Sequence, residues 1–252
     1  MLTFNSLELA ILINNFIWPL VRILSFFATA PFFNDENINK KIKIIFSVLI
    51  TVLIEPFLPK VHMELFSIMS LFVILQQILI GTALGFTCQF LFAAFNFSGE
   101  IIGLQMGLSF ANFFNANRYI GTSIVSRWIN ILILFLFLTI NAHLYLIVIL
   151  VDSFYSMPIN MNFISSSFFW SLLQFSSSIF LNGIIFALPI MIFLLLSALI
   201  MSILNRLSPQ ISIFSIGFPL NLLIGMFIIY YLISIIFPFF KNSLNQLITF
   251  LS

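Results

Sequence analysis

The chain has 252 residues and a formal net charge of +2, and 62% of its residues are hydrophobic whereas only 6% are charged. Soluble domains contain about 25% charged residues, so this composition and the mean hydropathy of +1.22 exclude an ordinary soluble globule. The small net charge and the short basic runs argue against a nucleic-acid partner. The single cysteine, Cys88, excludes a disulfide within the chain and a cysteine-based metal site.

Hydrophobic helices are predicted along almost the whole chain. A helix that crosses a membrane needs about 20 consecutive, mainly apolar residues. In chain order, helices are expected at residues 9–33, 42–58, 65–97 and 124–151, with one or two between 163 and 204 and a last one at 211–240. The predicted fold is an all-α polytopic integral membrane protein with about six hydrophobic helices, forming a single unit over residues 1–252.

Prolines interrupt this pattern at several places and predict that some of the helices are kinked or broken, because proline removes a backbone hydrogen bond. A break near Pro189 would raise the number of spans to seven. The prolines within or at the ends of the predicted segments are Pro19, Pro31, Pro56, Pro189, Pro219 and Pro238.

The distribution of lysine and arginine predicts an orientation in the membrane. Cytoplasmic ends of spans carry an excess of these residues. In a six-span arrangement Lys60 and Lys241 fall on one side, and the remaining counted cations fall on the other, which places both termini outside the cytoplasm. Those cations are Lys40, Lys41, Lys43, Arg118, Arg127 and Arg206.

Two sets of regularly spaced glycines predict close helix packing. Gly99, Gly103 and Gly107 recur every four residues, and Gly81 and Gly85 form a second pair. On a helix, residues four apart share one face, and small residues there let another helix approach closely. Glu100 lies beside the first stripe, and the sequence leaves two roles equally open for it: a carboxylate that caps a helix terminus, or a functional contact.

The residues after Gly107 change in character. Phe110, Phe113 and Phe114 are interleaved with Asn112 and Asn115, a mixture that is not typical of a membrane helix. Irregular backbone at membrane depth is tolerated only where it is buried in protein or faces a water-filled path. The sequence therefore predicts an irregular loop in one of those two environments.

The apolar segments also contain isolated charged residues, which cost about 2.5 to 3.5 kcal/mol each at the centre of a bilayer. For Arg22 and Arg127 the sequence favours snorkelling to the membrane surface or an internal ion pair. Nothing indicates an enzyme, since no metal-ligand spacing, nucleophile elbow or phosphate-binding glycine loop is present in the sequence. We expect no catalytic residue, cofactor or metal ion.

An ordered set of motifs resembles a known family. The segment Gly99-Glu-Ile-Ile-Gly-Leu-Gln-Met-Gly-Leu-Ser-Phe-Ala111 is similar to the signature of the flagellar biosynthetic protein FliR family, which includes the SpaR and YscT proteins of injectisomes. Three further stretches match in order and extend the resemblance over nearly the whole chain. They are Arg22 to Pro31, Gln76 to Phe86, and Asn205 to Leu220.

The resemblance implies a core subunit of the type III secretion export gate in the bacterial inner membrane, at the flagellar basal body. Its implied partners are FliP-like and FliQ-like subunits, an FlhB-like subunit, unfolded export substrates and membrane lipid. Family members raise their hydrophobic hairpins out of the bilayer in the assembled complex. The packing residues that we expect to serve this assembly are Gly81, Gly85, Gly99, Glu100, Gly103, Gly107, Pro209, Gly217 and Pro219.

The resemblance also assigns a role to the predicted loop, because the family has a plug loop here that narrows the closed pore. The residues to which this role carries over are Phe110, Ala111, Asn112, Phe113, Phe114 and Asn115. Many relatives have an acidic residue followed by proline where this chain has Asn115-Ala116. The competing hypothesis is a secondary transporter or channel subunit, which broken helices, Glu100, Arg127 and an irregular loop would also suit.

Overall fold

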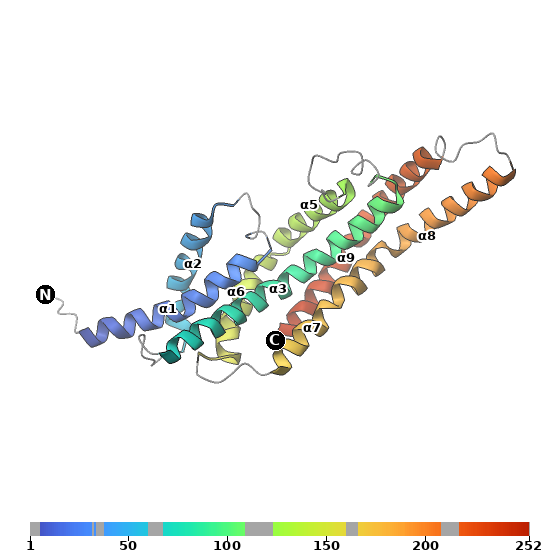
Figure 1. Ribbon diagram of the computed structural model, residues 1–252. Helices are drawn as coiled ribbons and strands as arrows, with labels where there is room; N and C mark the ends of the chain where they lie inside the picture. Colours follow the sequence, from blue (N-terminus) through green and yellow to red (C-terminus); the bar gives the residue numbers. More distant parts are fainter. Residues whose placement is uncertain are drawn as a thin grey trace. The chain divides into compact units, whose positions relative to one another are not determined.

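The computed structural model describes residues 6–31, 33, 38–59, 68–108, 123–159, 166–207 and 217–251. Every regular element in these ranges is helical (Figure 1), which confirms the all-α prediction. The elements are α1 (Ser6–Thr29), α2 (Lys40–Ile54), the 3₁₀ turn η1 (Glu55–Phe57), α3 (Ile68–Gln105), α5 (Ile124–Thr139), α6 (Ala142–Ser156), α7 (Ser166–Ser176), α8 (Ser178–Leu207) and α9 (Phe218–Leu251).

Three of these stretches are long and apolar enough to cross a membrane. They are α3 with 38 residues, Ser166–Leu207 with 42 and α9 with 34. A helix rises about 1.5 Å per residue, so each is longer than the roughly 30 Å of hydrocarbon that one perpendicular crossing requires. The pair α5 and α6 makes a fourth candidate if the two count as one broken span. The described part of the chain therefore contains three or up to four spans by length and composition.

The expected single helix at 124–151 is wrong. The chain instead forms α5 and α6, which are bent by 71° relative to each other. At the joint Asn141 has φ 57°, in the left-handed region, which asparagine tolerates better than most residues. By contrast Pro19, Pro189 and Pro238 lie inside α1, α8 and α9. The sharp break therefore comes from an asparagine in a left-handed conformation, at a place where no proline occurs.

The described helices divide into two compact units. The first comprises residues 1–89, 142–176 and 248–252, and the second comprises residues 90–141 and 177–247. Helix α3 contributes its first part to one unit and its last part to the other. The grouping of residues 1–252 into one functional unit stays a prediction.

A buried arginine joins three helical segments of the first unit. Arg22 on α1 is 0% exposed. Its Nε donates to Gln77 Oε1 on α3 at 2.7 Å, and its Nη1 and Nη2 donate to the backbone oxygens of Ser153 and Met157, each at 2.8 Å. The guanidinium carbon also lies 4.2 Å from the centre of the Phe154 ring. Arg22 is therefore the residue through which α1, α3 and the end of α6 are connected.

The acceptors around Arg22 explain why a cation is tolerated there. Carbonyl groups near the C-terminus of a helix carry partial negative charge. Ser153 lies in the last turn of α6, and Met157 follows the helix directly. The acceptors found for Arg22 in the described residues are all uncharged. Among the described residues Arg22 is thus buried on neutral acceptors, neither at the surface nor in an ion pair, and a helix terminus supplies compensating negative charge.

Gly81 and Gly85 lie directly against α1 of the same chain. A Cβ at Gly81 would stand 2.0 Å from Ser25 Oγ and 2.4 Å from the backbone oxygen of Arg22. A Cβ at Gly85 would stand 2.0 Å from Thr29 Oγ1 and 3.0 Å from the backbone oxygen of Phe26. The two helices therefore meet almost backbone to backbone, and this glycine pair packs within the chain. Whether it also serves assembly with other subunits stays a prediction.

Replacing Arg22 by leucine should destabilise the first unit strongly. The change leaves Gln77 Oε1 and the half-buried Met157 oxygen without the donor that Arg22 supplies, and it removes the bond to the Ser153 oxygen, at a cost of about 3 kcal/mol or more. Arg22→Lys should recover only part of this loss, since an ammonium lacks the planar fork of donors. The midpoint of unfolding of the detergent-purified protein measures the effect, and the exposed Arg206→Leu is the control. Equal midpoints for Arg22→Leu and Arg206→Leu would contradict the role of Arg22.

Gly81→Ala should also destabilise the protein, by about 1 to 3 kcal/mol, because the new methyl group meets a backbone oxygen. In an unconstrained helix the same change stabilises by about 1 kcal/mol, so the sign of the effect is the test. At both glycines the nearest atom is a side-chain oxygen, but the nearest backbone oxygen is 2.4 Å away at Gly81 and 3.0 Å away at Gly85. In double-mutant cycles of unfolding free energy, Thr29→Ala should therefore rescue Gly85→Ala more fully than Ser25→Ala rescues Gly81→Ala.

Candidate functional site

The C-terminal end of α3 is closed by hydrogen bonds that require a glycine. The N–H of Leu108 donates to the Gly103 oxygen at 3.0 Å, and the N–H of Gly107 donates to the Leu104 oxygen at 3.0 Å. Gly107 itself has φ 81°. This pair of bonds around a left-handed glycine is the Schellman arrangement that ends many helices. Gly107 therefore terminates α3, whereas the glycine spacing had placed it on a helical packing stripe.

The next helix, α5, begins at a residue that is capped from two directions. Ser123 Oγ accepts a hydrogen bond from the N–H of Ser126 at 3.1 Å, as an N-cap residue does. The N–H of Ser123 donates to Glu100 Oε1 at 2.8 Å. A carboxylate near the start of a helix is favoured by the positive end of the helix dipole. Of the two roles that the sequence left open for Glu100, the structure shows the capping contact, made to α5 and not to its own helix.

Gly99 lets α3 and α5 approach closely at the same place. A Cβ at Gly99 would stand 2.5 Å from the Cα of Ser126. The hydroxyl of Ser123 donates to the Gly99 oxygen at 3.1 Å, and the hydroxyl of Ser126 donates to the Asn96 oxygen at 3.2 Å. The end of α3 and the start of α5 are thus tied together by four side-chain hydrogen bonds, counting the longer one from Ser126 to Asn96 Oδ1, and by a contact that only glycine permits.

We call this set of contacts, made by Asn96, Gly99, Glu100, Ser123 and Ser126, the loop base. Residues 109–122, which connect the end of α3 to the start of α5, contain the predicted plug, Phe110 to Asn115. These residues lie outside the described part of the chain, as does Pro209. The helix terminus at Gly107 and the cap at Ser123 fix the two ends of this segment. The loop base therefore positions the connection without depending on the conformation inside it.

The other predicted packing residues have different surroundings. Gly103 is buried near the end of α3, and its oxygen is the acceptor in the helix-ending bond from Leu108. Gly217 is buried directly before α9. Pro219 lies in the first turn of α9, where a missing backbone N–H costs nothing because that donor has no partner within the helix. None of these observations tests a role in subunit assembly.

Sequence reasoning missed two glycines of the second unit. A Cβ at Gly183 on α8 would stand 2.8 Å from the Ala94 oxygen, and a Cβ at Gly225 on α9 would stand 2.6 Å from the Met106 side chain. Each is an isolated glycine with no partner four residues away, so the spacing rule gave no signal. The aromatic rings between these helices also pack together, with Phe95 centred 5.3 Å from Phe186.

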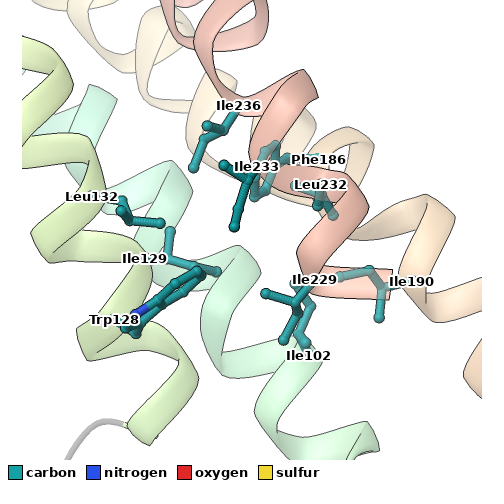
Figure 2. Close-up of a pocket in the computed structure, with 10 residues that line it drawn as sticks. All are labelled: Ile102, Trp128, Ile129, Leu132, Phe186, Ile190, Ile229, Leu232, Ile233 and Ile236. Carbon is teal, nitrogen blue, oxygen red and sulfur yellow. The ribbon is translucent and has the colours of Figure 1, made fainter. Parts of the chain in front are cut away.

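An apolar pocket lies between α3, α5, α8 and α9 in the second unit. Figure 2 shows side chains of α5 facing those of α9 across it. The lining residues are Ile102, Trp128, Ile129, Leu132, Phe186, Ile190, Ile229, Leu232, Ile233 and Ile236. Water is not held in such a site, because it needs two or more polar partners. Within the described residues no cluster of histidine, cysteine and carboxylate side chains that would hold a metal ion is found either.

Long apolar helices and an anchored connecting loop define the class of this protein as an α-helical membrane protein. A family model described as bacterial export proteins, family 1, matches residues 13–247. The flagellar biosynthetic protein FliR of Buchnera aphidicola subsp. Schizaphis graminum is 72% identical over 251 residues, which cover 100% of this chain and 97% of that protein. FliR of Escherichia coli strain K12 is 43% identical over 240 residues, covering 95% and 92% respectively.

A more distant relative is FliR of Bacillus subtilis strain 168, with 24% identity over 230 residues that cover 90% of this chain and 89% of that protein. The chain therefore belongs to the FliR family of bacterial export proteins. This confirms the resemblance found in the sequence motifs. It also makes the chain a membrane-embedded protein of flagellar biosynthesis and export. The relatives are named for biosynthesis and export, and those names do not denote an enzyme.

The loop base predicts different outcomes for two substitutions of Glu100. Glu100→Gln keeps an acceptor for the Ser123 N–H and should cost about 0.3 to 1 kcal/mol, the usual size of a lost charge–dipole interaction. Glu100→Ala leaves that N–H without its partner and should cost about 1 to 3 kcal/mol. Amide hydrogen exchange at Ser123 should be faster in the alanine variant than in the glutamine variant. Wild-type exchange in Glu100→Ala would contradict the capping role, and Glu55→Ala serves as the control carboxylate.

Proposed function

We propose that this protein is a core subunit of the type III secretion export gate, which forms with FliP and FliQ the pore for unfolded flagellar proteins. The observation that carries the proposal is the family match over residues 13–247, together with the loop base at the family's signature segment. The flagellar names of the relatives favour flagellar use over an injectisome. The proposed location is the bacterial inner membrane, within the flagellar basal body.

The exposed surface of the second unit supports a role inside a larger complex. Phe193 and Leu199 on α8 and Phe227 and Tyr230 on α9 are all more than half exposed. Apolar surface of this extent is covered by lipid or by other protein in a stable membrane protein. FliP-like, FliQ-like and FlhB-like subunits are the proposed partners on the protein side. No cofactor and no nucleic acid enters this proposal.

The loop base supports a plug role for Phe110 to Asn115. A closure element must be held firmly at its ends so that it returns to the same place after cargo has passed. Phenylalanine rings close a pore by making the constriction too apolar for water. Anchored ends and an aromatic centre are therefore the combination that a plug requires, and the substrates would be unfolded chains narrow enough to pass when the loop moves.

The transporter hypothesis receives less support. It depended partly on charged residues inside apolar segments, where a transporter would use them for substrate or ions. Glu100, one of the two charged residues on which it was based, instead caps α5. This contact is structural. A transporter would also be isolated as a monomer or small homo-oligomer, so the composition of the detergent-extracted complex separates the two functions.

Replacing both Phe110 and Phe113 by alanine should make resting membranes leaky to small solutes while the protein is still recovered with FliP and FliQ. Removal of two rings should wet an apolar constriction. The paired control, Asn112→Ala with Asn115→Ala, retains all the rings and should stay tight. Solute leak and recovered complex are measured on the same cells.

The other possible outcomes of this experiment would each contradict a different part of the proposal. A tight membrane with a normal complex would exclude the plug but leave the gate subunit in place. Loss of the complex would indicate that these rings pack against a neighbouring helix, where each is worth roughly 3 to 5 kcal/mol. Isolation of the wild-type protein without FliP and FliQ would contradict the proposed function itself.

A further inference from the structure

Helix α2 carries its apolar side chains on the outside. Its buried residues are Ser47, Ile50, Thr51 and Ile54, two of which are hydroxyl residues. Both hydroxyls donate to carbonyls of their own helix at 2.7 Å, Ser47 to Lys43 and Thr51 to Ser47. They are therefore satisfied without a partner on another helix, and their small size suits the face that packs on α1.

The opposite face of α2 is a continuous aliphatic stripe. Its members are each more than half exposed, from Ile45 at 65% and Leu53 at 63% to Leu49 at 52%, with Ile42 and Val52 between these values. Their spacing of three or four residues places them on one side of the helix. Phe57, in the 3₁₀ turn that follows, is 70% exposed. We call this set, Ile42, Ile45, Leu49, Val52, Leu53 and Phe57, the α2 stripe.

Positive charge is concentrated at one end of the α2 stripe. Lys40, Lys41 and Lys43 lie in the first turn, and that turn contains no acidic residue. Lys40 and Lys41 are exposed. The positive end of the helix dipole lies at this turn and disfavours cations there by a few tenths of a kcal/mol or more each. Three lysines at this position therefore do not stabilise the helix by themselves, and an external anion would relieve their repulsion.

Helix α2 is too short to cross a membrane. Its 15 residues span about 22 Å, too short for the roughly 30 Å of hydrocarbon in a bilayer. A helix with one apolar face and basic residues at one end suits a position with the apolar face against acyl chains and the cations among anionic headgroups. The far end of this helix is held in place, because the Tyr155 hydroxyl of α6 donates to the Phe57 oxygen.

We propose that the α2 stripe is a lipid-contact surface and that Lys40, Lys41 and Lys43 bind the headgroups of anionic phospholipids. The charge at one end and the aliphatic face along the helix select this occupant over a neutral lipid. Each lysine near an anionic membrane surface contributes about a fivefold gain in binding, so three contribute up to roughly a hundredfold. The proposal does not rest on the export-gate function, because it uses only the exposed side chains, the charge and the length of α2.

The test measures how much phosphatidylglycerol and phosphatidylcholine the detergent-purified full chain retains from mixed micelles, by native mass spectrometry. The two lipids are given identical acyl chains, so that only the headgroup differs. The wild-type protein should retain the anionic lipid at least tenfold better, and added salt should reduce this preference. The variant Lys40→Gln/Lys41→Gln/Lys43→Gln should lose the preference and keep its weak binding of the neutral lipid.

Three further variants make the result specific. Lys241→Gln, an exposed lysine on α9, should retain the wild-type preference. Leu49→Ser with Leu53→Ser should weaken retention of both lipids alike, because it alters the acyl-chain contact. Lys41→Gln alone should lower the preference about fivefold, and it supplies the same readout if the triple variant does not fold.

Several outcomes would overturn the proposal. An unchanged preference in the triple variant would mean that the lysines are neutralised within the chain, for which Asp35 and Glu36 stand nearby in the sequence. Equal retention of the two lipids by the wild-type protein would exclude headgroup recognition. Loss of accompanying subunits from the triple variant, with lipid retention intact, would show that the α2 stripe faces another protein.

Discussion

The guanidinium of Arg22 imposes the main constraint on the first unit. A fully buried cation is stable only if its donors are satisfied and its charge is compensated, since desolvation costs several kcal/mol. Gln77 and the carbonyls at the end of α6 meet both requirements. Because these acceptors belong to α3 and to the α6 terminus, neither element can shift far relative to α1 without leaving donors or acceptors unpaired. The α2 stripe depends on this as well, since α2 packs on α1 and η1 is tied to α6.

The close packing of α3 against its neighbours follows a second, repeated rule. Gly81 and Gly85 lie against the hydroxyl residues Ser25 and Thr29, and Gly99 lies against Ser126. Association of helices in a lipid environment relies on close van der Waals contact and hydrogen bonds, since lipid is as apolar as the side chains themselves. A glycine opposite a small hydroxyl residue permits the close contact in each unit. Thr29 and Ser126 also donate hydrogen bonds across to α3, whereas the Ser25 hydroxyl bonds its own helix.

The loop base fixes both ends of the connection between α3 and α5. Glu100 and the Ser123 hydroxyl bind across the gap between α3 and α5, so the positions of the loop ends do not rely on the loop itself. Gly107 ends α3 through a left-handed turn, which fixes the direction in which the chain leaves the helix. The proposed plug would benefit from this arrangement, because residues outside the plug hold its two ends.

The sequence by itself determined the membrane class, the helical fold and the family, because composition, periodicity and the order of motifs are properties read along the chain. Only the tertiary structure decided which groups meet. The partners of Arg22 lie 55 and 131 residues away, and Glu100 bonds a residue 23 positions on. The break at Asn141, which carries no proline signal, and the outward aliphatic face of α2 also required it. Such features depend on which surfaces pack together, and apolar segments of similar composition allow many pairings until small residues and buried polar groups select one.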